Sequence, residues 1–261
     1  MTFSDAKQRF SNRAVDYARY RPGYPSALID LLRAECGLRS DAVVADIGSG
    51  TGFLARLFLE NGNPVFAVEP NEEMRRAGEG YLSSCENFSS IDGSCDATTL
   101  PDLSVEVIAA GQSFHWFEPL GTRREFLRIL KPHGWVIIIW NDRRISETSF
   151  GRAYEDLLVR YGTDYARVKE AYPETHDMES FFGTGNFQRR ELPNSQEFDF
   201  DGLSGRLRSS SYAPKEGHAN YAPMAAALRE LFDATQEFGR VRMDYTTQIY
   251  FGQLDRLRNP G

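Results

Sequence analysis

The sequence predicts an α/β protein with a doubly wound, mostly parallel sheet and helices on both faces. Short apolar runs alternate along the first half of the chain with patterns that repeat at helical spacing. One of these runs, at residues 135–140, is apolar at nearly every position, as is typical of a strand covered on both faces. Strands that alternate with helices in this way form parallel sheets through right-handed crossovers.

Each element of the first half has a local reason. A proline suits the first turn of a helix at 25–36, whose leucines and isoleucine supply an apolar face. A buried strand at 43–47 leads into a glycine turn and a helix at 53–60. A second strand at 64–69 is followed by Asn71, a candidate N-cap for a helix that ends near residue 82. The other expected elements are strands at 88–91, 105–110 and 135–140, a helix at 123–130 and a turn at 131–134.

The pattern changes after residue 141, where longer strands with two distinct faces are expected. In one of them Met243, Tyr245 and Ile249 alternate with polar residues. We expect two such strands to form an antiparallel pair at the edge of the same sheet, within a single domain that covers residues 1–261. The expected elements are strands at 188–200 and 242–251 and helices at 149–161, 165–171 and 221–238.

The composition argues against several classes of protein. The formal net charge of −7 disfavours a general nucleic-acid binder, because phosphate contacts need a basic surface. Cys36, Cys85 and Cys95 fit no zinc or disulfide spacing, so we expect reduced thiols and no metal site. The polar N-terminus and the lack of a long apolar run favour a cytoplasmic protein without a membrane partner.

A glycine turn joins the first strand to the helix that follows it. Asp46 precedes Gly48, Gly50 and Gly52, which stand at alternate positions with Ser49 among them. Glycines at a strand-to-helix turn allow bare backbone to approach a ligand. The sequence therefore predicts a binding site at the carboxyl end of this strand.

Three further features follow the later strands, at the edge where open parallel sheets bind ligands. Glu69 ends the second strand, seventeen residues after the last of the glycines, where an acid can accept two hydrogen bonds from a ribose diol. Asp96 and Ala97 follow the third strand, in a place suited to an adenine amino group. The segment 111–117, which includes Gln112, follows the fourth strand directly. Separately these residues could be simple turn formers, caps and loop acids, but their common register favours one site.

The spacing of the glycines indicates the class of ligand. A dinucleotide fingerprint reads G-x-G-x-x-G, whereas this turn reads G-x-G-x-G with Asp46 two residues ahead of it. An acid at that position would repel a pyrophosphate but would suit an ammonium group. A ligand with a ribose, an adenine and a charged amino acid is therefore favoured over NAD.

At these residues the sequence resembles the class I S-adenosylmethionine-dependent methyltransferases, which have a Rossmann-like fold. It is most similar to the methyltransferase type 11 domain, including the small-molecule enzymes that are like trans-aconitate methyltransferase. The resemblance rests on residues 44–52, 67–70, 96–97, 114–117 and an upstream segment at 17–25, and it covers residues 10–140 well. It implies a seven-stranded sheet whose last strand is antiparallel.

We expect the single domain to divide into three parts. Residues 1–40 would form an N-terminal lid and helix, 41–141 the cofactor-binding core, and 142–261 the substrate-side helices and the last two strands. Pro70 departs from the usual pattern because proline offers no backbone donor to the cofactor. Contacts with S-adenosyl-L-methionine are expected from Asp46, Gly48, Ser49, Gly50, Gly52, Glu69, Pro70, Asp96, Ala97 and Gln112, and from Tyr17 and Arg21 of the lid. The alternative for the lid is a solvated entrance strand whose arginines pair with surface acids.

The acceptor side carries several candidates, each with a structural alternative. His115 is the candidate general base, or else a structural histidine bonded to backbone. Trp116 and its neighbouring phenylalanines are either walls of the methyl-transfer pocket or core aromatics. Arg143 follows the fifth strand, where it can grip an anionic acceptor or face solvent. Tyr212, with Arg206 nearby in the sequence, is expected to close the acceptor pocket.

We therefore predict a methyltransferase that uses S-adenosylmethionine to methylate a small molecule at a carboxylate, a hydroxyl or an activated carbon. The sulfonium already activates the methyl group, so the protein mainly aligns the acceptor for in-line transfer. Two alternatives stay open: a nicotinamide-dependent oxidoreductase on the same type of sheet, and an S-adenosylmethionine-binding regulatory protein without catalysis. The sequence leaves the acceptor and the oligomeric state undetermined.

Overall fold

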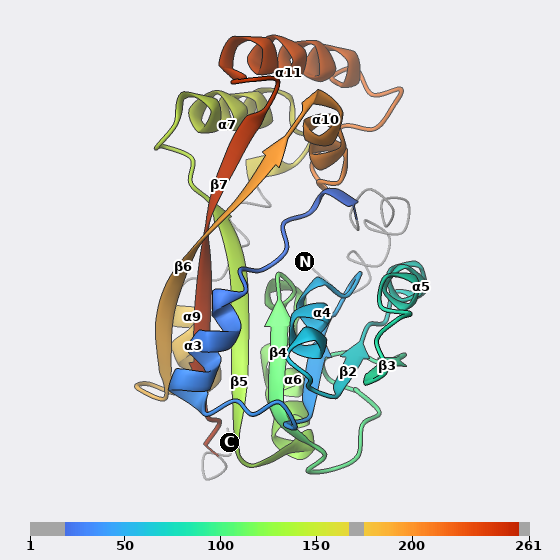
Figure 1. The fold of residues 1–261 in the computed structure, drawn as a ribbon, viewed down its shortest axis with the longest axis vertical. Helices are drawn as coiled ribbons and strands as arrows, with labels where there is room; N and C mark the ends of the chain where they lie inside the picture. The colour runs from blue at the N-terminus through green and yellow to red at the C-terminus, as the bar shows by residue number, and fades with distance from the viewer. Residues whose placement is uncertain (1–18, 167–174, 256–261) are drawn as a thin grey trace.

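The computed structural model describes residues 19–166 and 175–255. Within these residues it contains a seven-stranded sheet in the order β3-β2-β1-β4-β5-β7-β6 (Figure 1). The strands are β1 (Val44–Ile47), β2 (Val65–Val68), β3 (Phe88–Ile91), β4 (Val105–Gly111), β5 (Leu130–Arg143), β6 (Phe187–Phe198) and β7 (Val241–Gly252). The first five are parallel, and β7 runs antiparallel between β5 and β6. The predicted fold class is confirmed, including the antiparallel last strand.

Most helices lie where the sequence predicts them. Asn71 caps α5 by accepting hydrogen bonds from the backbone N–H groups of Glu73 and Met74 at 3.0 and 3.1 Å. One helix, α6, begins earlier than the predicted residue 123, because Pro119 fits its first turn and the Glu118 carboxylate caps it. The helices of the described residues are α3 (Ala27–Cys36), α4 (Phe53–Glu60), α5 (Glu72–Tyr81), the 3-10 helix η2 (Phe114–Trp116), α6 (Pro119–Ile129), α7 (Ser149–Tyr161), α9 (Thr175–Phe182), α10 (Phe200–Arg208) and α11 (Tyr221–Thr235).

Some expectations differ from the structure or fall outside it. The predicted turn at 131–134 lies within β5, where His133 has a φ of 63° and the pairing with β4 shifts register. The predicted helix at 165–171 lies largely outside the described residues. Three elements, η2, α9 and α10, were not predicted. Among the described helices, none combines the length and the apolar character needed to cross a bilayer.

The central strands β1, β4 and β5 bury side chains on both faces of the sheet. Val44 and Val107 lie in the apolar cluster that also holds residues of α3 and α4. Ile108 and Ile138, on the opposite face, lie in the cluster that holds residues of α6 and α9. This division follows from the period of two along a strand, because neighbouring residues point to opposite faces. Helices on both faces in turn explain why the run at 135–140 is apolar throughout.

The last three strands extend past the rest of the sheet and carry a second group of helices (Figure 1). The β5–β7 pairing continues as far as Arg143 opposite Tyr245, and the β6–β7 pairing as far as Phe198 opposite Val241. Around these far ends α7, α10 and α11 form a third apolar cluster. We refer to α7, α10 and α11 together as the cap.

Candidate active site

A cavity of about 340 Å³ lies where the carboxyl ends of β1, β4 and β5 face the cap. Its walls come from the glycine turn, from the ends of β4 and β5 and the residues that follow them, from the cap, and from residues 19–24, which we call the entrance segment. Of the residues predicted for the site, the cavity brings together Arg21, Asp46, Gly48, Ser49, Gly50, Gln112, His115, Trp116, Arg143 and Tyr212. Distant parts of the sequence thus meet at the predicted edge of the sheet.

The other predicted residues that the structure describes do not line this cavity. Asp96 and Ala97 are exposed in the loop after β3, where the Asp96 carboxylate accepts a hydrogen bond from the Ser94 hydroxyl at 2.5 Å. Their contact with an adenine group stays a prediction. Gly52 is the N-cap of α4, Glu69 and Pro70 follow β2, and Tyr17 lies outside the described residues.

The glycine turn has a backbone that only glycine adopts readily. Gly48, Gly50 and Gly52 have φ values of 67°, 57° and 87°, all in the left-handed region. At Gly48 a Cβ atom would lie 2.7 Å from the Cβ atom of Ser113, which follows β4. Backbone conformation and space therefore both exclude a side chain at Gly48, and the cavity reaches the backbone of the turn directly.

Asp46 places a carboxylate inside the protein beside this turn. It is 1% exposed, and neither carboxylate oxygen has a hydrogen-bond partner of normal geometry among the described residues. Burial raises the pKa of Asp46 to about 7; the backbone amide of Ala55 opposes this shift and the charge of Glu69 adds to it. A buried carboxylate without a partner is costly, so its position at a cavity wall indicates a site for a cationic group.

Glu69 supports the glycine turn from the neighbouring strand. One oxygen of its carboxylate accepts a hydrogen bond from the backbone N–H of Gly50 at 2.9 Å, and the other accepts one from the N–H of Asn71 at 2.8 Å. The residue is 8% exposed. A second carboxylate is thus held at the edge of the sheet by the backbone that forms the binding turn.

Gln112 is held in an unusual backbone conformation directly after β4. Its φ of 58° lies in the left-handed region, which residues with side chains rarely adopt. Its side-chain amide donates a hydrogen bond to the carbonyl of Asn141 at 3.2 Å, joining the ends of β4 and β5. Strain of this kind is common at binding sites, and no sequence pattern indicates it here.

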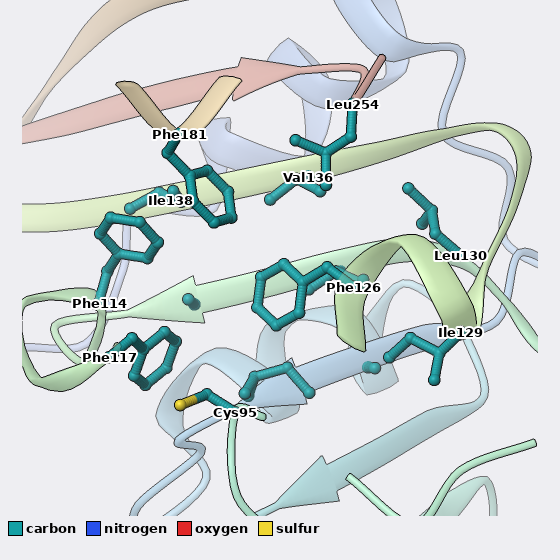
Figure 2. Close-up of a cluster of buried hydrophobic side chains, with 14 of the residues drawn as sticks. Cys95, Phe114, Phe117, Phe126, Ile129, Leu130, Val136, Ile138, Phe181 and Leu254 are labelled. Carbon is teal, nitrogen blue, oxygen red and sulfur yellow. The ribbon is translucent and has the colours of Figure 1, made fainter. Parts of the chain in front are cut away.

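The aromatic run after β4 divides between the core and the cavity. Figure 2 shows Phe114 and Phe117 pointing into the apolar cluster that includes Phe126 and Phe181. Trp116 instead lines the cavity, with its ring centroid 4.9 Å from that of His115. The structural alternative therefore fits the phenylalanines, and the pocket-wall alternative fits Trp116.

The largely buried side chain of His115 also lines the cavity. Burial lowers the pKa of His115 to about 4. Its imidazole is therefore neutral at neutral pH. A neutral imidazole can accept a proton, but a group with so low a pKa is a weak general base.

We expect His115 to stay neutral in the folded protein down to about pH 5. NMR titration of the imidazole Cε1–H signals, assigned with a His115→Gln variant, should show that its signal does not shift between pH 8 and about pH 5.5. Because the unfolded chain binds this proton more readily, the stability contribution of His115 is present above about pH 6.5 and is lost as the pH falls toward 4. An inflection near pH 6.5 in the folded protein would contradict this assignment.

Arg143 lies in a polar cluster between β5 and the cap. Its guanidinium donates to the Glu155 carboxylate at 3.0 Å and to the Tyr165 hydroxyl at 2.6 Å, and that hydroxyl donates to the same carboxylate at 2.5 Å. It also lies 5.3 Å from the ring centroid of Tyr154. The side chain is thus fixed at the cavity wall and its charge is matched by Glu155, which excludes the solvent-facing alternative.

Two residues of the chain after β6 complete the wall on the cap side. Arg206, on α10, is 4% exposed and donates a hydrogen bond to the Ser210 hydroxyl at 3.0 Å. Tyr212, which follows α10, is 8% exposed and packs its ring against that of Tyr165 with centroids 4.9 Å apart. Both residues line the cavity opposite the glycine turn, as their place in the sequence suggested.

The entrance segment is bound to both sides of the cavity. The Arg21 guanidinium donates to the carbonyl of Ser209 behind α10 at 3.0 Å. The carbonyl of Gly23 accepts hydrogen bonds from the side-chain amides of Asn141 and Asn194 at 3.1 and 2.9 Å. Arg21 therefore lies at the cavity, as the predicted lid requires, while its contact with a methionine moiety stays a prediction.

Sequence reasoning missed several residues of the cavity. Asn141 and Asp142 follow the apolar run at 135–140 directly, so the rule that ligands bind at carboxyl ends of strands could have found them. Tyr24 lies within the segment 17–25 that carries the resemblance but was not among the predicted site residues, whereas no local signal marks Tyr165. Among the described residues, no group of three or more His, Cys, Asp or Glu side chains is arranged to hold a metal ion.

The sheet order, the antiparallel β7, the glycine turn and the cavity at the strand ends define a Rossmann-like methyltransferase fold. A family model described as a methyltransferase domain matches residues 45–138. A methyltransferase-like protein of Schizosaccharomyces pombe is 30% identical over 255 residues, which are 94% of this chain and 95% of that protein. The chain therefore belongs to the methyltransferase family. Its place in the trans-aconitate methyltransferase-like subgroup stays a prediction.

Solved structures with this fold include known and candidate methyltransferases. A candidate type II methyltransferase from Anaeromyxobacter dehalogenans has a TM-score of 0.66 at 22% identity, over 90% of this chain and 98% of its own. A phosphoethanolamine N-methyltransferase of Haemonchus contortus, in complex with S-adenosylhomocysteine, has a TM-score of 0.56 at 13% identity, over 97% of this chain and 59% of its own. Several curated relatives match this chain over about half to two thirds of their own length.

Proposed function

We propose that this protein transfers a methyl group from S-adenosylmethionine to a small-molecule acceptor. The observation that carries the proposal is the buried carboxylate of Asp46, which lies without a hydrogen-bond partner among the described residues at the wall of the cavity. An amino-acid ammonium group would supply the missing partner, whereas a pyrophosphate would meet an acid. This favours S-adenosylmethionine over a nicotinamide dinucleotide.

The residues around the glycine turn fit this cofactor. Asp46 would pair with its ammonium group, and the backbone of Gly48 and Gly50 would approach it closely because no side chain intervenes. Glu69 would accept hydrogen bonds from the ribose hydroxyls. The sulfonium of the bound cofactor would supply an activated methyl group, because no side chain of the protein can serve as a methyl donor.

The acceptor would lie between the glycine turn and the cap. Trp116 and Tyr212 would provide aromatic walls for the acceptor, and the guanidinium of Arg143 would lie beside it at the cavity wall. The entrance segment would limit access from solvent. The protein's part is to align the acceptor with the methyl group and to exclude water. A cavity of about 340 Å³ and a net charge of −7 both favour a small acceptor over a nucleic acid.

Calorimetry with S-adenosylhomocysteine and with NADH tests this function against its rivals. We expect micromolar binding of S-adenosylhomocysteine, the ligand of the worm enzyme with the same fold, and no heat with NADH. Preference for NADH would support the oxidoreductase alternative. Binding of S-adenosylhomocysteine without turnover of any acceptor would support the regulatory alternative.

A Gly48→Ala substitution should weaken S-adenosylhomocysteine binding at least about tenfold, because the added Cβ strains a left-handed residue at the turn and crowds Ser113. Gly185→Ala is the matched control, since Gly185 also has a positive φ, of 77°, but has open space around it. Circular dichroism should show that both variants fold. Equal affinities for the two variants would place the cofactor away from this turn.

A further inference from the structure

The cap contains a buried cation that has no acidic partner among the described residues. Arg206 is 4% exposed, and its guanidinium lies 3.0 Å from the Ser210 hydroxyl and 3.5 Å from that of Tyr245. The buried carboxylate of Glu155 is paired with Arg143. A guanidinium buried in this way is costly unless an anion completes its environment.

This cation faces the cavity and not only the interior of the cap. Arg206 and Tyr212 both line the cavity that Asp46 and Trp116 line from the opposite side. Burial by itself raises the pKa of Tyr212, but the charges of Arg143, Arg206 and Arg21 lower that pKa below its ordinary value. Positive potential therefore prevails at the cap side of the cavity, while Asp46 makes the glycine-turn side negative.

We propose that Arg206 binds an anionic group of the methyl acceptor, and that this group is a carboxylate; the inference rests on the proposed methyl transfer. A guanidinium presents a planar fork that matches the two oxygens of a carboxylate. Its single unmatched charge equals that of one carboxylate, whereas a phosphate monoester carries close to two charges at neutral pH. The cofactor's own ammonium would be held by Asp46 at the other side of the cavity, so the two ligands would be separated by charge.

The test combines an Arg206→Met variant with a defined panel of acceptors. The panel contains succinate, glutarate and benzoate, their primary amides, and phosphate monoesters, with production of S-adenosylhomocysteine as the readout. We expect turnover only with acids, and in the variant a KM for the acid at least about 100-fold higher with kcat changed much less. S-adenosylhomocysteine affinity should stay within about threefold, which separates this result from a failure of the proposed function.

Stability gives a readout that does not depend on finding the acceptor. Removing an unmatched buried charge should raise the Tm of the ligand-free variant by about 2 to 4 °C. Arg240→Met, which removes an exposed arginine just before β7, is the control and should change neither Tm nor KM. A lower Tm for Arg206→Met would assign Arg206 a structural role, and this result decides the matter even if no acceptor of the panel reacts.

Three other outcomes would also overturn the inference. A large loss of S-adenosylhomocysteine affinity in Arg206→Met would mean that Arg206 holds the cofactor's carboxylate instead. Turnover of amides as fast as of acids would show that no anion is required. Turnover of phosphate monoesters alone would replace the carboxylate with a phosphate.

Discussion

Replacing Asp46 with Asn should abolish measurable binding of S-adenosylhomocysteine and at the same time make the ligand-free protein more stable at neutral pH. Binding is lost because the amide cannot supply the charge that a ligand ammonium needs in a buried site. Stability rises because the asparagine amide, unlike the aspartate carboxyl group, does not ionise inside the protein. Calorimetry and thermal unfolding at pH 8 measure the two effects separately.

The sign and size of the stability effect follow from the pKa of Asp46. The folded pKa of about 7 lies above the value of 3.8 for an ordinary Asp, so the folded state binds this proton more tightly than the unfolded chain. The favourable contribution of Asp46 is therefore complete below pH 4 and is lost as the pH rises through 7. The full loss amounts to roughly 4 kcal/mol, and the Asn variant should escape it.

The ionisation of Asp46 should also make the affinity for S-adenosylhomocysteine depend on pH. In the unmodified protein, affinity for S-adenosylhomocysteine should rise about tenfold per pH unit below pH 7 and level off above it, since ionised Asp46 is the binding form. Asp41→Asn is a suitable control, because Asp41 is exposed just before the same strand. Unchanged affinity in Asp46→Asn, or a lower Tm at pH 8, would contradict the assignment of Asp46 as the ammonium partner.

A Glu69→Gln substitution should weaken S-adenosylhomocysteine binding by about 10- to 100-fold, the range expected when hydrogen bonds to a buried charge are lost. The carboxylate now accepts from the backbone N–H groups of Gly50 and Asn71, so part of the loss comes from a less firmly held turn. Calorimetry measures the affinity, and exposed Glu73 on the following helix supplies the control variant Glu73→Gln.

A double-mutant cycle separates the two contributions of Glu69. The second change is made in the ligand, with an analogue of S-adenosylhomocysteine that lacks the ribose 3′-hydroxyl. If Glu69 binds the ribose, the effects of the two changes should be less than additive. Full additivity would mean that Glu69 only supports the turn, and the ribose contact would have to be sought elsewhere.

The parts of the fold that could be predicted are those with local causes. The glycine turn, the Asn71 cap and the apolar run at 135–140 each depend on a few consecutive residues, and the structure places all three where expected. The common register of Asp46 and Gln112 followed from the rule that strands of a parallel sheet end at one edge. Most of the core side of the cavity could therefore be predicted from the sequence.

The cap could not be predicted in the same way, because its causes are tertiary. Helix α10 contains Gly202 and Gly205, which lower helix propensity, and its first residue, Phe200, was predicted as the end of a strand. The structure gives a reason for Gly205: a Cβ atom there would lie 2.1 Å from the ring of Tyr20 in the entrance segment. A contact between residues so far apart in sequence leaves no periodic signal. The burial of Arg206 likewise depends on packing between distant parts of the chain and leaves no local signal in the sequence.

The paired strands β5 and β7 continue from the sheet into the cap, and this continuity has a mechanical consequence (Figure 1). The sheet on one side of the cavity and the cap on the other are joined by the continuous backbone pairing of β5 with β7, which resists hinge bending between them. Reactants must therefore enter and leave past a part of the wall that is fastened less strongly. The entrance segment, residues 19–24, is such a part. Side-chain hydrogen bonds from Arg21 and to the carbonyl of Gly23 hold it to the rest of the protein, and such bonds are less stiff than the paired backbone of two strands.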